Sequence, residues 1–73
     1  MSNAIDNINA HADLGAEKRG NKIMITVYGR PAGYITDDDV QDAMDRTTPT
    51  GWPTSKALKK GALKVYEAIR SDV

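Results

Sequence analysis

The chain contains no cysteine and no phenylalanine, and its only histidine is His11. Without cysteine it can form neither a disulfide nor a thiolate metal site, and one imidazole cannot hold a metal alone. The consecutive residues Asp37, Asp38 and Asp39 would point about 100° apart on a helix, so they cannot converge on one ion. The glycines match neither a Walker A loop nor a dinucleotide fingerprint. We therefore expect a protein that is not an enzyme and that uses no metal, cofactor or small-molecule substrate.

Long hydrophobic runs are also missing, and no stretch has the length of a membrane span or of a signal-peptide core. We expect a cytoplasmic protein without membrane contact. The 73 residues suffice for one small domain. Domains of this size bury only about 60% of their unfolded surface. A core this small contributes roughly 3–5 kcal/mol of net stability, so good helix packing or a second copy is expected to support it.

The net charge of zero conceals a strong segregation of charge along the chain. Residues 31–45 contain five acidic residues and no basic one, whereas residues 46–66 contain five basic residues and no acidic one. Such segments either face each other or present opposite charges to different partners. Two solvated helix faces that pair loosely would give the same pattern.

The N-terminal part, residues 1–21, predicts a marginal helix followed by a loop. In residues 2–14 the small and apolar residues Ala4, Ile5 and Ile8 follow helical spacing, and Gly15 suits the position after a helix. Ser2 is the expected N-cap. Several Asn and Asp residues weaken this helix. We interpret residues 1–21 as an N-terminal helix or arm, separate from a compact domain at residues 22–73.

Residues 22–28, "KIMITVY", form the only convincing strand of the sequence. Their alternation puts Ile23, Ile25 and Val27 on one face, and Lys22, Met24, Thr26 and Tyr28 on the other. A short second strand at Tyr34–Ile35 would complete a small hairpin. A single strand leaves backbone groups unpaired, so it must find a partner in this chain or in a second copy.

Two helices are expected after the strand, which makes the fold class α+β. Residues 36–46 begin with Thr36 and Asp39 in capping-box spacing, and Val40, Ala43 and Met44 form the buried stripe. Thr54 or Ser55 would start the last helix, which runs to residue 70. Its core stripe consists of Leu58, Ala62, Val65, Tyr66 and Ile69. Its opposite side carries Lys56, Lys59, Lys60, Lys64 and Arg70, with Leu63 among them.

The order of strand, acidic helix, glycine-containing turn and basic helix over residues 22–70 resembles the ribbon-helix-helix repressors. The resemblance implies a homodimer in which each chain contributes one strand to a ribbon that enters the DNA major groove. Lys22, Met24 and Thr26 would then face the base edges. Thr54 and Ser55 would start the second helix and bind phosphate. The nearby lysines Lys56, Lys59 and Lys60 would add positive charge.

Two functions remain open at this point. The first is a prokaryotic, phage or plasmid regulator that binds duplex DNA as a dimer. The second is a small inhibitor or adaptor of the phage accessory type, which would bind a host protein through the basic C-terminal helix. Its expected anchors are the aromatic residues Trp52 and Tyr34 together with Leu63. Trp52 also fits a lid that folds back over the core.

Overall fold

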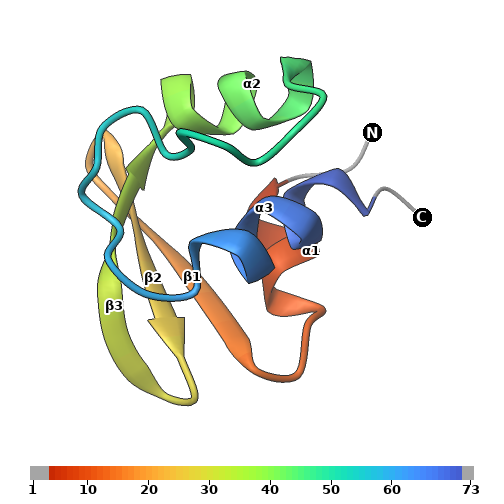
Figure 1. Cartoon of the computed structure of the whole chain (residues 1–73). Helices are drawn as coiled ribbons and strands as arrows, with labels where there is room; N and C mark the ends of the chain where they lie inside the picture. Colours follow the sequence, from red (N-terminus) through yellow and green to blue (C-terminus); the bar gives the residue numbers. More distant parts are fainter. Residues whose placement is uncertain (1–3, 72–73) are drawn as a thin grey trace.

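The computed structural model describes residues 4–71, which form a three-stranded sheet and three helices. In chain order the elements are α1 (Ala4–Asn9), β1 (Leu14–Arg19), β2 (Lys22–Val27), β3 (Arg30–Thr36), α2 (Asp37–Asp45) and α3 (Ala62–Arg70). The sheet is antiparallel with β2 in the centre. Helices α1 and α3 pack together beside the sheet, and α2 lies beyond the end of β3 (Figure 1).

The strand predicted at residues 22–28 is confirmed as β2, and so is its division into two faces. Ile23 and Ile25 are buried, Val27 is half-buried, and all three point toward the helices. Ile35 of β3 and Leu14 of β1 continue this apolar face. The intervening side chains of β2 point to the opposite side, as the two-residue period of a strand requires.

The expectation of one strand is wrong, because the chain forms three. Residues 14–19, expected to end a helix and enter a loop, pair with β2 at six positions from Leu14↔Val27 to Arg19↔Lys22. The local pattern of "LGAEKR" is too weak in apolar residues to predict a strand. The ladder of hydrogen bonds to β2 stabilises this segment instead. The expected hairpin exists, but β3 is longer than the two residues predicted for it.

The N-terminal helix is shorter than predicted, and Gly15 lies in β1 rather than after a helix. The expected cap, Ser2, falls outside the described residues. Ile8 is fully buried, and α1 packs against both β1 and α3. Residues 4–21 therefore belong to the same folded unit as the residues that follow them.

Helix α2 begins as the sequence predicted. The Thr36 hydroxyl accepts a hydrogen bond from the Asp39 backbone N–H, and the Asp39 carboxylate accepts one from the Thr36 N–H. This is the predicted capping box. Ala43 is buried and Val40 is half-buried, but the expected burial of Met44 is wrong, since this side chain is 49% exposed.

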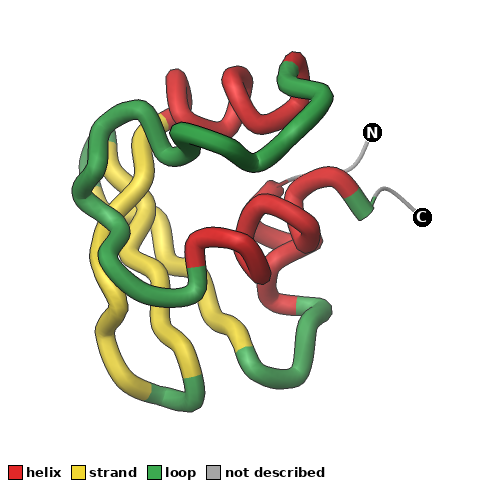
Figure 2. Tube along the Cα trace, in the orientation of Figure 1, coloured by secondary structure: helices red, strands yellow, loops and turns green. Residues whose placement is uncertain are grey.

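The last helix is about half as long as expected, because α3 begins only at Ala62. Val65, Tyr66 and Ile69 are buried as predicted. Residues 46–61 form a long connection that passes beside β3 before it reaches α3 (Figure 2). Gly61 allows this approach, since a Cβ atom there would lie 2.7 Å from Cγ2 of Val27.

The fold that the ribbon-helix-helix resemblance implied is not the one observed. In that fold the strand pairs with a second copy, whereas β2 forms hydrogen bonds with β1 on one side and β3 on the other. Its backbone groups are thus satisfied within one chain, and the argument for an exchanged strand no longer applies.

Candidate nucleic-acid interface

The face of the sheet that points away from the helices carries the three strand residues predicted to contact DNA. Lys22, Met24 and Thr26 alternate along β2, and Tyr34 of β3 stands opposite Met24. The Lys22 ammonium lies 5.9 Å from the centre of the Tyr34 ring, within the range of a cation–π contact. Tyr34 remains 42% exposed. The prediction that Lys22, Met24 and Thr26 share one face is therefore confirmed, although β2 has a neighbouring strand on both sides. Tyr34, which was predicted as a protein-interface anchor, lies on the same face.

A second group of side chains, which we call the basic strip, consists of Arg30, Lys56, Lys59 and Lys60. All four are exposed, and none forms an ion pair with an acidic residue in the described part of the chain. The other basic residues of that part are engaged: Arg70 donates to backbone carbonyls, Lys22 lies over Tyr34, and four form ion pairs. These pairs are Lys18–Asp37, Arg19–Glu17, Arg46–Asp42 and Lys64–Asp13.

The backbone of the basic strip is held against β3. The Lys59 N–H donates a hydrogen bond of 3.3 Å to the Ala32 carbonyl oxygen. Leu58, between the lysines, is buried in the core. Gly33 permits the contact, because a Cβ atom there would collide with the backbone of Ala57 and Leu58. Lys56, Lys59 and Lys60 were predicted on the outer side of a helix, which is wrong, whereas Lys64 does lie on α3. The three lysines lie on an irregular segment beside the edge of the sheet, where Lys56 has a φ angle of 57°.

Thr54 and Ser55 do not start a helix, so they offer no helix N-terminus to a phosphate group. They bind the carboxylate of Asp39, which is fully buried. The Thr54 hydroxyl donates to Oδ1 over 2.6 Å, and the Ser55 hydroxyl donates to Oδ2 over 2.6 Å. The Ser55 N–H also donates to Oδ1. The predicted phosphate contacts of Thr54 and Ser55 are therefore replaced by a structural role, in which they tie the connection to α2.

The pKa of Asp39 reflects this environment. Burial raises the pKa, but the hydrogen bonds from Ser55, Thr54 and Thr36 outweigh it, so the pKa lies below its ordinary value of 3.8. The carboxylate is thus held in its charged form. Its donors include the backbone N–H of Thr36, before α2, and that of Ser55, in the connection to α3.

Trp52 is the lid over the core that the sequence allowed, and it is not an exposed anchor. Its side chain is 6% exposed, and its indole N–H donates a hydrogen bond of 2.7 Å to the Asp39 carbonyl oxygen. Its ring meets Tyr66 edge to face, with ring centres 5.9 Å apart.

Leu63, in contrast to Trp52, is exposed, with 56% of its side chain accessible. It lines a hollow of about 310 Å³ together with Pro49, Thr50, Trp52 and Ala62.

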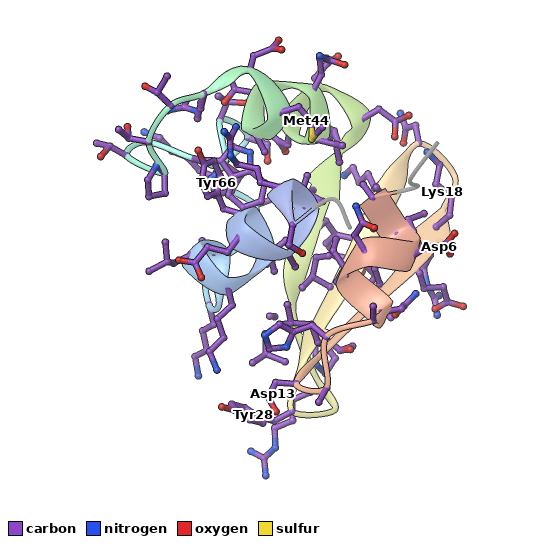
Figure 3. The ribbon with its side chains drawn as sticks, turned by 90° about the vertical axis from the view of Figure 1, so that its right-hand side faces the viewer. Asp6, Asp13, Lys18, Tyr28, Met44 and Tyr66 are labelled. Carbon is purple, nitrogen blue, oxygen red and sulfur yellow. The ribbon has the colours of Figure 1, made fainter. Side chains whose placement is uncertain are left out.

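Sequence reasoning missed the contribution of the turn between β2 and β3. Tyr28 and Gly29 form this two-residue turn, and Tyr28 is 68% exposed. The Tyr28 N–H bonds to the Asp13 carbonyl oxygen, and the two residues lie at the same end of the molecule (Figure 3). The signal was present in the sequence as "YG" between two apolar runs, although tyrosine is unusual at such a position.

A hollow of about 440 Å³ opens beside this turn and connects it to the basic strip. Val27, Pro31 and Ala32 contribute apolar surface, and Arg30 and Lys60 contribute positive charge. Tyr28 lines the same hollow.

The hydrogen bond from Lys64 to the Tyr28 hydroxyl, with the nearby Asp13 carboxylate, raises the pKa of Lys64 above its ordinary value.

Comparisons with protein-family models, with curated proteins and with solved structures found no match for this chain. Within residues 4–71 no three His, Asp or Glu side chains are grouped as metal ligands would be. None of the helices in the same range is long and apolar enough to cross a membrane.

Proposed function

We propose that this protein binds nucleic acid, with duplex DNA as the partner, through the basic strip and the adjoining outer face of the sheet. The observation that carries the proposal is the concentration of exposed, unpaired positive charge in the basic strip. Proteins bind the phosphate backbone by placing Lys and Arg where phosphates can replace their counterions. A chain of zero net charge that leaves four cations unpaired on β3 and the connection beside it has a suitable place for a polyanion.

Four acidic residues support this orientation because they lie on α2, whereas Glu17 of β1 stands opposite Met24 and is paired with Arg19. Asp37, Asp38, Asp42 and Asp45 belong to α2, beyond the end of the sheet (Figure 1). Two of them are engaged by the basic residues Lys18 and Arg46. The outer sheet face supplies Lys22 and Thr26, which can bond to base edges or to phosphates.

The proposal is tested by the salt dependence of binding to a random-sequence duplex. Each phosphate that a cation neutralises contributes about −0.9 to the slope of log K against log salt. Four contacts from the basic strip would lower the affinity on the order of 100-fold between 50 and 200 mM salt. Lys59→Gln and Lys60→Gln should each weaken binding and reduce the slope by about 0.9.

Lys18→Gln is the matched control, because it removes one positive charge from β1, outside the basic strip. It should leave both affinity and slope nearly unchanged. Failure of the wild-type protein to shift duplex DNA at low salt would refute the proposed function. An equal effect of Lys18→Gln and Lys60→Gln would refute the assignment of the surface.

A second candidate function, binding to a partner protein, is favoured by Leu63. This side chain is 56% exposed and lines an apolar hollow whose floor includes the buried Trp52. In that case Leu63→Ser should abolish capture of the partner and leave DNA binding intact. Trp52 is no longer a suitable test residue, because replacing it would disturb the core.

A further inference from the structure

The hollow beside the β2–β3 turn has the composition of a site for a flat, anionic ligand. Its volume of about 440 Å³ falls within the range of roughly 300–1,000 Å³ that is typical of small-molecule pockets. Val27, Pro31 and Ala32 provide apolar contact, while Arg30 and Lys60 provide two cations that no described acidic residue neutralises. The ring of Tyr28 completes the lining.

Tyr28 has a backbone conformation that the turn favours for residues other than tyrosine. Its φ angle is 54°, in the left-handed region that Gly and Asn adopt more readily than an aromatic residue. Strained positions of this kind are concentrated at functional sites. Part of the role of Tyr28 is structural. The Lys64 ammonium lies 4.9 Å from the centre of its ring and donates a hydrogen bond of 2.9 Å to its hydroxyl. That contact does not require the large exposure of 68%.

We propose that this hollow binds an unpaired base of a nucleic acid, which stacks on the Tyr28 ring while Arg30 and Lys60 contact the flanking phosphates. This inference rests on the proposed function and adds to it that the preferred nucleic acid contains an unpaired nucleotide. In a closed duplex the faces of the bases are covered by their neighbours, so an aromatic ring can stack only on a base that is unpaired. Single strands, overhangs and bulges offer such bases, and stacking on aromatic side chains is the usual way in which proteins bind them.

The test compares two fluorescent probes of about a dozen nucleotides per strand, a length within the range that a small domain covers. One is single-stranded oligothymidine and the other is a blunt duplex. The variants of the full chain are Tyr28→Asn and Tyr28→Phe. Asparagine is favoured at this position of the turn, so the Tyr28→Asn variant should keep the fold of the protein. Phenylalanine keeps the stacking surface and loses only the hydroxyl that Lys64 contacts.

Tyr28→Asn should weaken binding of the single strand about tenfold, a typical effect of removing one stacking side chain. It should change binding of the blunt duplex less than twofold. Tyr28→Phe should bind both probes as the wild type does. Lys60→Gln should weaken both probes, because each of them presents phosphates.

Three results would overturn the inference. If the wild type binds both probes and Tyr28→Asn alters neither affinity, the hollow holds no base. If Tyr28→Phe and Tyr28→Asn weaken single-strand binding equally, the contact with Lys64 explains the tyrosine. If the wild type binds neither probe at low salt, the proposed function fails together with the inference.

Discussion

Replacing Asp39 with asparagine should destabilise the protein by about 2–3 kcal/mol, although the two side chains have nearly the same shape. Each carboxylate oxygen of Asp39 accepts one backbone N–H and one hydroxyl: Ser55 N–H and Thr54 on Oδ1, Thr36 N–H and Ser55 on Oδ2. An asparagine must place its NH₂ group at one of these two positions. A hydroxyl can turn to accept a hydrogen bond, but a backbone N–H cannot. One of these N–H groups is therefore left facing another donor, whichever way the amide is turned.

Asp39→Ala should cost more, about 3–5 kcal/mol, because all four donors lose their acceptor and the fully buried Asp39 side chain leaves a gap. A domain of 73 residues has a stability of about 4–11 kcal/mol at the usual value per residue. At the lower end of this range the alanine variant should be close to unfolding at room temperature. Asp38→Asn is the control, since Asp38 is exposed in the same helical turn. It should lose less than about 1 kcal/mol through the helix dipole.

The free energy of unfolding is measured by urea denaturation, with Trp52 fluorescence and circular dichroism as the two signals. Trp52 is the only tryptophan, and its indole bonds to the Asp39 carbonyl oxygen, so its emission reports on release of the connection from α2. In the wild type both signals should change together. Equal stability of Asp39→Asn and Asp38→Asn would refute the reasoning about the four donors.

The same network predicts a dependence on pH. Because the pKa of Asp39 in the folded protein lies below 3.8, the unfolded chain takes up the proton first as the pH falls. The stabilisation is therefore complete above about pH 5 and is lost as the pH falls through the folded pKa. Asp39→Asn has no such proton to bind, so its stability should fall less steeply in acid than that of the wild type. Parallel acid profiles would contradict the assignment of the charged form.

Three further predictions concern packing, and each is checked by urea denaturation. Gly61→Ala should cost about 2–3 kcal/mol, because the φ angle is 71° and the added Cβ atom would lie 2.7 Å from Val27. Gly20→Ala is the control and should cost about 1 kcal/mol, because its φ angle is 60° but the space around it is open. Equal losses would show that the contact with Val27 is unimportant. Ile25→Ala should cost about 3 kcal/mol or more, and Met24→Ala less than about 1 kcal/mol, because these neighbours point to opposite faces of the sheet; a larger loss for Met24 would reverse the two faces. Leu63→Ser should change stability by less than about 0.5 kcal/mol, and a larger loss would mean that Leu63 is packed rather than exposed.

The parts of the fold that were predicted correctly depend on spacings of two to four residues. The alternation of β2, the capping box at Thr36 and the buried stripe of Val65, Tyr66 and Ile69 are all of this kind. The grouping of Lys22, Met24 and Thr26 on one surface follows from the same alternation. Such patterns are properties of the local backbone geometry, so they can be derived without knowledge of the rest of the chain.

The start of the last helix was predicted wrongly because a distant group decides it. Thr54 and Ser55 are good capping residues by type, and the sequence after them has helical periodicity. In the folded protein their hydroxyls bind a carboxylate that lies 15 and 16 positions earlier in the chain. The helix then begins only at Ala62, and Lys56, Lys59 and Lys60 are left on an irregular segment beside β3.

The sequence by itself determined that cysteine chemistry is absent, which faces of β2 and α3 are apolar, and where α2 begins. Only the tertiary structure decided that β1 is a strand, that Trp52 is buried, and that the unpaired cations Arg30 and Lys60 meet Tyr28 at one hollow. The physical reason is the range of the interactions. Side-chain periodicity acts within a few residues, whereas strand pairing and the burial of Asp39 join segments far apart in the chain, and no local pattern records which segments will meet.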